Sequence, residues 1–448
     1  MLLLIGFLLT ILFGLLISFV FISKEFNPIE RLGLSYVVGL GLQTFFMFLM
    51  YVLGYKFNLL NTLLILLTVI IPLLILERIK LIQFVNGIKT VFSINTFKKH
   101  EKITVGIIAL FILFSLWSTL YWPVSSWDSL VLYDWRAKLF YLTGTMTEGI
   151  SRGYFFGVPL LTSLAHTWAY FLGAKQPEFI YTLYLASFAA MFYGALRMFT
   201  TRTISLITTL LLITTPDIFM HSTFSYTNFP YTVYFVMSTI YLYIWMVKEK
   251  SSYLPISAIL LGLSTWTRSS EPFWIVNLLV LIIFCIYKRK VLSPVFFGIF
   301  FFLIRQPWVW FENSKLDYST TVSSKIIQGI SVIFEKINIG HTFIVLKFLY
   351  DNFFVGIAVF LFAFIFVLTL EFKQAWRNKD FWLSSMVIGY VLLVVVGTYV
   401  FSLTFRDWEI GGSLTRMGMF IPPLIYFYVA SSKKINDLFV KTNNGNNK

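Results

Sequence analysis

A polar stretch, residues 121–160, interrupts a chain that otherwise consists mostly of long apolar runs. Among its aromatic residues stand six charged ones: Asp128, Asp134, Arg136, Lys138, Glu148 and Arg152. Asp128 follows Trp127 and precedes an amphipathic segment, so we expect its carboxylate at a membrane surface, beside rings that can stack on a sugar. A carboxylate there can act as general base, removing the proton from an acceptor hydroxyl as it attacks an activated anomeric carbon. The stretch therefore predicts a catalytic loop.

Asp134 and Lys138 allow two interpretations. Their spacing of i, i+4 is typical of an ion pair on one face of a helix, and we favour this interpretation for Asp134. The alternative is that Asp134 assists Asp128 and contacts the substrate.

Arginines near the ends of apolar runs form a second group of candidates. Arg268 stands with Glu271 in TWTRSSEP, Arg305 in FFLIRQPWVW and Arg416 in SLTRMGMF, and FRDWEIGG adds Arg406, Asp407 and Glu409. An ionisable group costs about 2.5–3.5 kcal/mol at the centre of a membrane helix, less toward the interface. Neighbouring carboxylates can compensate, as can the phosphate of a lipid-linked substrate, which guanidinium binds through paired hydrogen bonds. Snorkelling at helix ends is the alternative. We expect Arg268, Arg305 and Arg416 to bind a donor phosphate.

Metal and nucleotide motifs are weak or absent in the sequence. The four histidines, His100, His166, His221 and His341, show no spacing such as HExxH. Asp217 and His221 are close in TTPDIFMHSTFSYTNFP and could hold a divalent metal ion or contact substrate, although a surface histidine is the favoured interpretation. No GxSxG, Walker A or GxGxxG motif occurs, which disfavours a catalytic triad and a direct sugar-nucleotide donor.

The composition is that of a membrane protein. Hydrophobic residues make up 58% of the 448 residues and charged residues only 12%, and the mean hydropathy is +0.81. The single cysteine, Cys285, lies in an apolar run, so no disulfide framework is expected. The first apolar run lacks a basic segment and a cleavage site, which favours a retained membrane helix over a signal peptide.

Apolar runs of bilayer length predict thirteen membrane spans. The spans are 2–22, 35–54, 59–76, 103–121, 179–196, 203–216, 229–247, 254–267, 272–287, 291–304, 352–370, 382–402 and 417–430. The run 159–173 is a fourteenth candidate, and its placement decides the orientation of everything after it.

Charge distribution resolves that placement. If 159–173 lies along the membrane surface, most of the 35 lysine and arginine residues fall in loops on one side. These loops are 23–34, 77–102, 197–202, 248–253, 288–290, 371–381 and 431–448. The positive-inside rule then predicts an outside N-terminus, a cytoplasmic C-terminus and an outward-facing Asp128 loop. The net charge of +15 is thus mostly a cytoplasmic-face feature suited to anionic lipids, and nucleic acid is not expected as a partner.

The chain divides into three predicted parts. Residues 1–102 form an N-terminal three-span extension with a cytoplasmic loop, 103–430 a transmembrane catalytic module, and 431–448 a basic tail. The module carries an outward catalytic loop, 122–178, and a second outward loop, 306–351. Within the second loop, 325–337 has helical spacing of isoleucines, which is typical of an interfacial helix or of a helix packed on neighbouring spans.

In these residues the chain resembles the polytopic glycosyltransferases of the GT-C class, which includes protein mannosyltransferases and lipid A aminoarabinose transferases, and most closely an uncharacterised bacterial branch. The first outward loop of that branch has a pattern like WDALAYWLPKAK and then a YPLLLPL-like element, which here read WDSLVLYDWRAK and YFFGVPL. The resemblance implies Asp128 as catalytic base and places Lys138, Tyr154 and Pro159 on motif positions.

Two later elements extend the resemblance, which covers most of the chain from about residue 103. LSTWTRSSEP resembles an AWTKNEG-like element and places Arg268 and Glu271 on its basic and acidic positions, and SLTRMGMFIPPLIYFY resembles a final RLLLHLLP-like span carrying Arg416. One departure is Asn228 in YTNFP, where the class has an acid in a YADLP-like element. Another is that the element after Tyr154 lacks the first proline.

Together these features predict an all-α polytopic protein with about thirteen transmembrane helices and juxtamembrane helices after the fourth span. The expected function is inverting transfer of a sugar from a polyprenyl-phosphate donor to a glycan, lipid or protein acceptor outside the plasma membrane. One alternative is a polyprenyl-diphosphate-dependent polysaccharide polymerase or ligase, which depends more on arginines than on Asp128. The other is a lipid-linked glycan flippase, for which charges at mid-membrane depth and a repeat between halves are typical.

Overall fold

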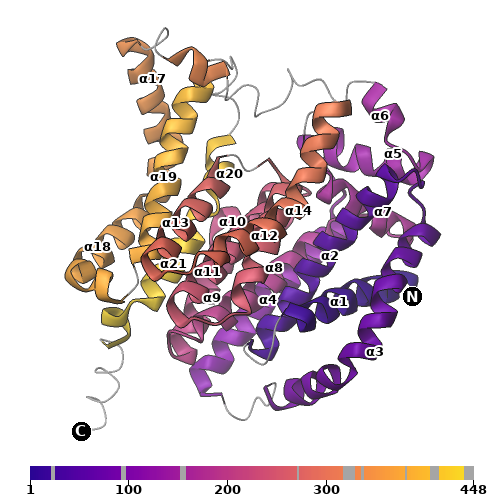
Figure 1. The fold of residues 1–448 in the computed structure, drawn as a ribbon, viewed down its shortest axis with the longest axis horizontal. Coiled ribbons are helices and arrows are strands. Elements are labelled where there is room, and N and C mark those ends of the chain that lie inside the picture. The colour runs from indigo at the N-terminus through magenta and orange to yellow at the C-terminus, as the bar shows by residue number, and fades with distance from the viewer. Residues whose placement is uncertain are drawn as a thin grey trace.

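The computed structural model describes residues 1–21, 26–91, 97–151, 158–269, 272–315, 328–333, 338–378, 381–403 and 413–437. These residues form helices and no strand, so the all-α fold class is confirmed for the described part of the chain (Figure 1). Within it, nine helices are long and apolar enough to cross a membrane, and three shorter apolar helices accompany them. This is the architecture of a polytopic membrane protein.

The described helices, in chain order, are α1 (Leu2–Phe21), α2 (Pro28–Val52), α3 (Leu59–Val91), α4 (Lys99–Tyr121), η2 (Ser129–Asp134), α5 (Trp135–Thr143), α6 (Thr147–Ser151), α7 (Leu161–Phe171), α8 (Phe179–Leu196), α9 (Arg202–Thr214), α10 (Pro216–His221), α11 (Asn228–Lys248), α12 (Tyr253–Thr267), α13 (Phe273–Lys288), α14 (Leu292–Lys315), α17 (Ile339–Leu349), η4 (Tyr350–Phe354), α18 (Val355–Asn378), α19 (Phe381–Ser402), α20 (Ser413–Gly418) and α21 (Ile421–Ser431). The segments η2 and η4 are π-helical. Every predicted span overlaps one of these helices, while the number of crossings stays a prediction.

The helices α2, α8 and α11 form the centre of the bundle, and most of their residues are buried. The Tyr36 hydroxyl of α2 donates to the carbonyl oxygen of Ile180 at 3.0 Å, and the Tyr234 hydroxyl of α11 donates to that of Val37 at 2.7 Å. Such bonds satisfy polar groups that no water would reach inside an apolar bundle. By contrast, α3 and α4 expose most of their apolar residues, as expected of lipid-facing helices.

Within the N-terminal segment 1–102, α2 and half of α1 are buried in the bundle, whereas α3 is mostly exposed. Helices α1 and α2 cross so closely that a Cβ atom added at Gly14 or Gly39 would collide with the backbone of the other helix. The sequence predicts this segment as an addition, but α2 is among the most buried helices. Hydropathy cannot make this distinction, because lipid and a protein interior are similarly apolar.

At one end of the bundle, described residues from four of the loops that the charge distribution assigns to a single side contact one another in pairs. An ion pair between Arg202 and Glu101, at 3.8 Å, joins the start of α9 to the start of α4. The Ser432 hydroxyl donates to the Glu371 carboxylate at 2.6 Å, which joins the residue after α21 to α18. We call this the basic end.

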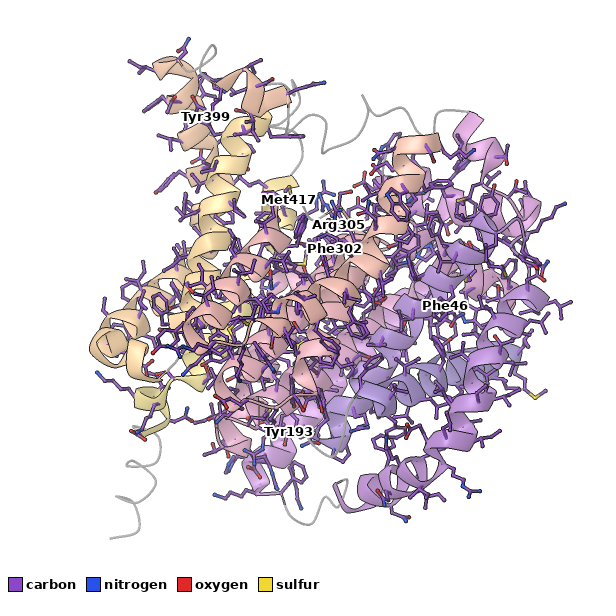
Figure 2. All side chains as sticks on the ribbon, in the orientation of Figure 1. Phe46, Tyr193, Phe302, Arg305, Tyr399 and Met417 are labelled. Carbon is purple, nitrogen blue, oxygen red and sulfur yellow. The ribbon has the colours of Figure 1, made fainter. Side chains whose placement is uncertain are left out.

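Figure 2 makes the two ends visible, with Tyr193 of α8 near the basic end and Met417 of α20 toward the opposite one. We call the opposite end, where α4, α12 and α14 finish and α8, α11 and α21 begin, the site end. Asp128 and Arg416 both lie there.

Both boundaries of the predicted second loop differ from those in the structure. The sequence predicts a loop at 306–351, but α14 continues to Lys315 and α17 already begins at Ile339. The apolar run ends before Arg305 and Pro307, yet the helix continues, because proline is tolerated inside membrane helices where neighbouring groups satisfy the freed carbonyl. Of the predicted helix 325–337 only 328–333 lie among the described residues.

The segment 159–173 forms the short helix α7, of 11 residues. At 1.5 Å per residue such a helix is about 16 Å long, roughly half of the hydrocarbon thickness. It packs against α5 and α2 and is almost fully buried. That this segment lies along the membrane surface without crossing stays a prediction.

Candidate functional site

The Asp128 carboxylate forms an ion pair with Arg416, with 3.0 Å between Oδ2 and Nη1. Both side chains remain accessible, Asp128 at 41% and Arg416 at 24% of full exposure. The Arg416 guanidinium also lies over the ring of Tyr226, 5.3 Å from its centre. Burial raises the pKa of Tyr226, and the negative charge of Asp128 contributes, which places the phenol close to this carboxylate.

Local sequence explains how Asp128 reaches the site end. Pro123 follows α4 and cannot continue a helix, and the preceding residue, Trp122, is extended with φ −86° and ψ 136°. The chain becomes helical again at Trp127, and Asp128 is the N-cap of η2. Single-turn π segments are frequent at functional sites. Asp128 thus stands at the start of a new helix beyond the end of α4.

Arg268 joins the same group from α12. The helix ends at Thr267, and Arg268 follows in extended conformation, with φ −155° and ψ 143°. Its guanidinium donates a hydrogen bond to the side-chain oxygen of Asn228, the first residue of α11. Burial lowers the pKa of Arg268. Asn228 stands two residues after Tyr226, over which Arg416 lies. Arg268 and Arg416 therefore contact the same short segment of the chain.

The site cluster, as we call it, consists of Asp128, Tyr226, Asn228, Arg268 and Arg416. Its members come from the loop after α4, the loop before α11, the first residue of α11, the residue after α12, and α20. The sequence predicts Asp128, Arg268 and Arg416 as functional residues, and the structure brings these three together.

Tyr133 connects the site cluster to the interior. Its hydroxyl shares a hydrogen bond with that of Thr227, at 3.1 Å, and the Arg136 guanidinium lies 5.8 Å from its ring centre. Arg136 is fully buried and donates to the carbonyl oxygen of Val158 at 3.0 Å. Burial lowers the pKa of Arg136 to about 10, so it stays charged at neutral pH. These contacts hold η2 and α5 against the start of α11.

His221 contacts Asp217 through the backbone. Its Nδ1 lies 2.9 Å from the Asp217 carbonyl oxygen, four residues earlier in α10. Burial lowers the pKa of His221, and the positive charge of Arg416 adds to the effect. Among the residues that the structure describes, no three or more His, Cys, Asp or Glu side chains are arranged to hold a metal ion. A metal on Asp217 and His221 stays a prediction.

Asp134, at the other end of η2, belongs to a different cluster. Its carboxylate pairs with Lys138 at 2.8 Å, accepts a hydrogen bond from the Tyr170 hydroxyl, and lies 3.4 Å from Nδ1 of His166. Nε2 of His166 in turn contacts the Tyr181 hydroxyl at 3.0 Å. The ion pair predicted for Asp134 and Lys138 is thus present, and we call these five residues the buried network.

The buried network keeps Asp134 ionised. Burial by itself raises the pKa of a carboxyl group. For Asp134 the hydrogen bonds and charges of His166, Lys138 and Tyr170 outweigh burial and hold its pKa well below the usual range. Asp134 is 1% exposed and Lys138 is 56% exposed, so the lysine is the outer edge of this network.

Glu178 connects the two clusters. It precedes α8 and accepts a hydrogen bond from the Ser225 hydroxyl at 3.0 Å, and Ser225 is followed by Tyr226 of the site cluster. Burial raises the pKa of Glu178 to about 7, and the negative charge of Asp134 contributes.

The other predicted residues have different surroundings. Arg305 stacks over Trp274, 5.1 Å from the ring centre, and interacts with Glu312 of its own helix. These contacts give Arg305 partners in α13 and α14. Tyr154 and Glu271 lie outside the described residues, as do Arg406, Asp407 and Glu409.

Sequence reasoning missed Tyr226, Tyr133 and Glu178. Tyr226 stands in SYTNFP, where the sequence pattern points only to the acid that Asn228 replaces. Glu178 is an isolated carboxylate next to the apolar run of α8, and such an acid near hydrocarbon needs a partner. That argument could have identified Glu178, whereas tyrosines are too common in this chain to be singled out.

The site cluster combines three chemical capacities. An accessible carboxylate can accept a proton, two arginines can bind an anion with several oxygens, and an aromatic ring offers a face for cation or sugar contacts. Because Arg416 contacts both Asp128 and Tyr226, an arriving anion would compete directly for it.

Comparison of the chain with protein-family models, with curated proteins and with solved structures finds no match in any of the three. The functional argument therefore depends on the site itself.

Proposed function

We propose that this protein is a GT-C-type glycosyltransferase that moves a sugar from a polyprenyl-phosphate donor to an acceptor at the outer face of the plasma membrane. The observation that carries the proposal is the site cluster, in which an accessible carboxylate and two arginines meet at one end of an apolar bundle. The resemblance of WDSLVLYDWRAK to the first loop of that class supports Asp128 as the general base. In this proposal the site end faces outward and the basic end faces the cytoplasm.

Donor binding would change the partner of Arg416. In the free protein this arginine is paired with Asp128 at 3.0 Å. A donor phosphate offers Arg416 and Arg268 oxygens for bidentate hydrogen bonds, which are stronger than a single one. When Arg416 moves to the phosphate, the Asp128 carboxylate becomes available to an acceptor.

The transfer itself is a single displacement. Asp128 removes the proton from the acceptor hydroxyl as its oxygen forms a bond to the anomeric carbon. The bond between that carbon and the phosphate oxygen breaks, and its electron pair stays on polyprenyl phosphate. Arg268 and Arg416 stabilise the developing negative charge. Because attack and departure occur on opposite sides, the configuration of the anomeric carbon inverts.

The test compares purified wild type with Asp128→Asn in liposomes, using a panel of labelled polyprenyl-phosphate sugars and total membrane acceptors. We expect transfer to fall about 10²–10⁴-fold, because the amide cannot accept the proton. Donor binding should persist, since both arginines remain. Asp351→Asn, which changes an exposed aspartate of η4 outside the site cluster, is the matched control and should keep full activity.

Two outcomes would contradict the proposal. If wild type transfers sugar from no monophosphate donor, the donor class is wrong. If Asp128→Asn retains full transfer, Asp128 is not the base, and the arginines rather than this carboxylate carry the catalysis.

A further inference from the structure

A groove opens at the site end, apart from the site cluster. It has a volume of about 760 Å³, a size typical of small-molecule sites. Its walls come from the end of α2 and the turn after it, the connection between α5 and α6, and the last two turns of α14, in the upper right of Figure 1. Half of this groove thus belongs to the N-terminal segment 1–102, outside the resemblance to GT-C enzymes.

The groove has a consistent chemical character. Of the described residues that line it, Lys56 and Lys315 carry positive charge and none carries a negative charge. Aromatic side chains form much of the wall, including Tyr55 and Trp310, which are 60% and 65% exposed. Leu49 adds an apolar floor. Lysines near exposed tryptophan and tyrosine are typical of the level at which lipid head groups meet hydrocarbon.

The turn that carries Lys56 is fixed in place. The Phe57 amide donates to the Gly144 carbonyl oxygen at 2.9 Å, and the Asn61 side chain donates to the Lys56 carbonyl oxygen at 2.9 Å. The buried Phe57 ring stacks on Tyr51 with 4.9 Å between ring centres. Lys56 is therefore presented by a rigid backbone, which lowers the entropy cost of binding.

Gly144 lies where the α5–α6 connection packs against this turn. Its φ of +69° is in the left-handed region, and an added Cβ would lie 3.0 Å from the Phe57 carbonyl oxygen. The position requires glycine for both reasons, and the α5–α6 connection could not otherwise pack against the turn.

A layer of aromatic rings separates the groove from the site cluster. Phe311 lines the groove and stacks on Trp308 with 5.6 Å between ring centres, and Trp308 lies 5.8 Å from Trp266. Trp266 is two residues before Arg268 of the site cluster. The two sites are therefore neighbours at the same end, and no residue of the site cluster lines the groove.

We propose that this groove binds an anionic membrane lipid, whose phosphate head group lies between Lys56 and Lys315 and whose chain follows the apolar wall along Leu49 and Val52. A membrane lipid fits better than a soluble phosphate because the rim consists of exposed apolar and aromatic side chains. The proposal gives the N-terminal segment a function, and it does not depend on the reaction proposed for the site cluster.

Trp310 provides the readout. Full-length protein in phosphatidylcholine nanodiscs is titrated with brominated phosphatidylglycerol or, as the neutral control, brominated phosphatidylcholine. Bromine quenches tryptophan only at short range, and the difference between wild type and Trp310→Phe isolates the Trp310 signal. We expect the anionic lipid to quench Trp310 at a lower mole fraction, by about fivefold for each lysine.

Lysine variants test whether the groove causes the preference for the anionic lipid. Lys56→Gln with Lys315→Gln should abolish the preference for the anionic lipid, whereas Lys347→Gln, which changes an exposed lysine of α17 outside the groove, should preserve it. Equal quenching by both lipids in wild type would overturn the proposal, as would an unchanged preference in the double variant. Loss of the preference in millimolar inorganic phosphate would also overturn it, because the groove would then recognise free phosphate.

The experiment separates this inference from the proposed function. Asp128→Asn should lose transfer and keep the lipid preference. A wild-type protein that prefers the anionic lipid but transfers no sugar would refute the proposed reaction and leave the lipid site standing.

Discussion

Asp128 and Asp134 lie at the two ends of the same π-helical segment, η2, but differ in their exposure to solvent and in their partners. Asp128 is 41% exposed, and the ion pair described for it is with Arg416. Asp134 is 1% exposed and is surrounded by Lys138, His166 and Tyr170. A carboxylate with one accessible partner can exchange that partner for substrate, whereas one enclosed by several partners cannot.

The comparison indicates that a carboxylate able to take part in chemistry can be recognised by a partner that a second anion can draw away. Both aspartates follow from the same stretch of sequence, and both have basic partners. Only Asp128 keeps solvent access and shares its arginine with a position where a second anion could bind. Asp134 stabilises the position of η2, at whose start Asp128 lies, because the contacts of the buried network connect η2 with α7 and α8.

The largest expected effect is on stability, in Asp134→Asn. The substitution removes the buried negative charge that Lys138, His166 and Tyr170 surround and replaces one acceptor oxygen by a donor, so we expect the free energy of unfolding to fall by about 3 kcal/mol. Asp128→Asn should lower it by less than about 1 kcal/mol, because that pair is accessible. Titration with sodium dodecyl sulfate, followed by tryptophan fluorescence, measures both. Equal destabilisation by the two variants would remove the distinction between the two aspartates.

A smaller effect is expected in Asn228→Asp, which tests whether Arg268 is kept free for an anion. In the structure the Asn228 amide accepts a hydrogen bond from Arg268 without cancelling its charge. A carboxylate of the same size would form an ion pair and compete with a donor phosphate. We expect polyprenyl phosphate to bind about tenfold more weakly, equivalent to about 1.4 kcal/mol.

Equilibrium binding of a fluorescent polyprenyl phosphate in detergent provides that measurement. Asn313→Asp adds the same charge at an exposed position of α14 outside the site cluster and serves as control. If Asn228→Asp binds the probe as tightly as wild type, Asn228 only positions the end of α12, and Arg268 is not a phosphate ligand.

Much of the fold could be predicted from apolar run length, since every predicted span overlaps a helix. The errors have physical causes. The end of α14 was misplaced because Arg305 and Pro307 look like a helix end, although Arg305 has Trp274 and Glu312 as partners inside the bundle. The central position of α2 was not predictable, because hydropathy does not distinguish lipid contact from burial.

The site was partly predictable for a different reason. Charges that are costly near a membrane must have partners, and this argument identified Asp128, Arg268 and Arg416. Which charges meet depends on the rotation of each helix and on loop conformation, so Arg305 was grouped with them on the same evidence. Tyr226 lies in the cluster through its ring, which no charge argument detects.

The smallest effect concerns Glu178, which links the two regions through Ser225. Its pKa is raised to about 7 in the folded protein, mainly by burial. A raised pKa contributes stability that is complete below the unfolded value, about 4.3, and is lost as the pH rises through about 7. The pKa of Asp134 is lowered, so its contribution is present above about pH 4 and constant from pH 5 to 8.

The thermal unfolding midpoint in detergent should therefore fall from pH 5 to pH 8 at constant ionic strength. Glu178→Gln keeps an acceptor for Ser225 but cannot titrate, so it should reduce this dependence, to which Glu30 and Glu312 also contribute because burial raises the pKa of each. Asp128→Asn should leave it unchanged, because the accessible pair is separate from the buried titration. If Glu178→Gln shows the same slope as wild type, Glu178 is not the group that responds, and another carboxyl whose pKa burial raises, such as Glu30 or Glu312, would account for the slope.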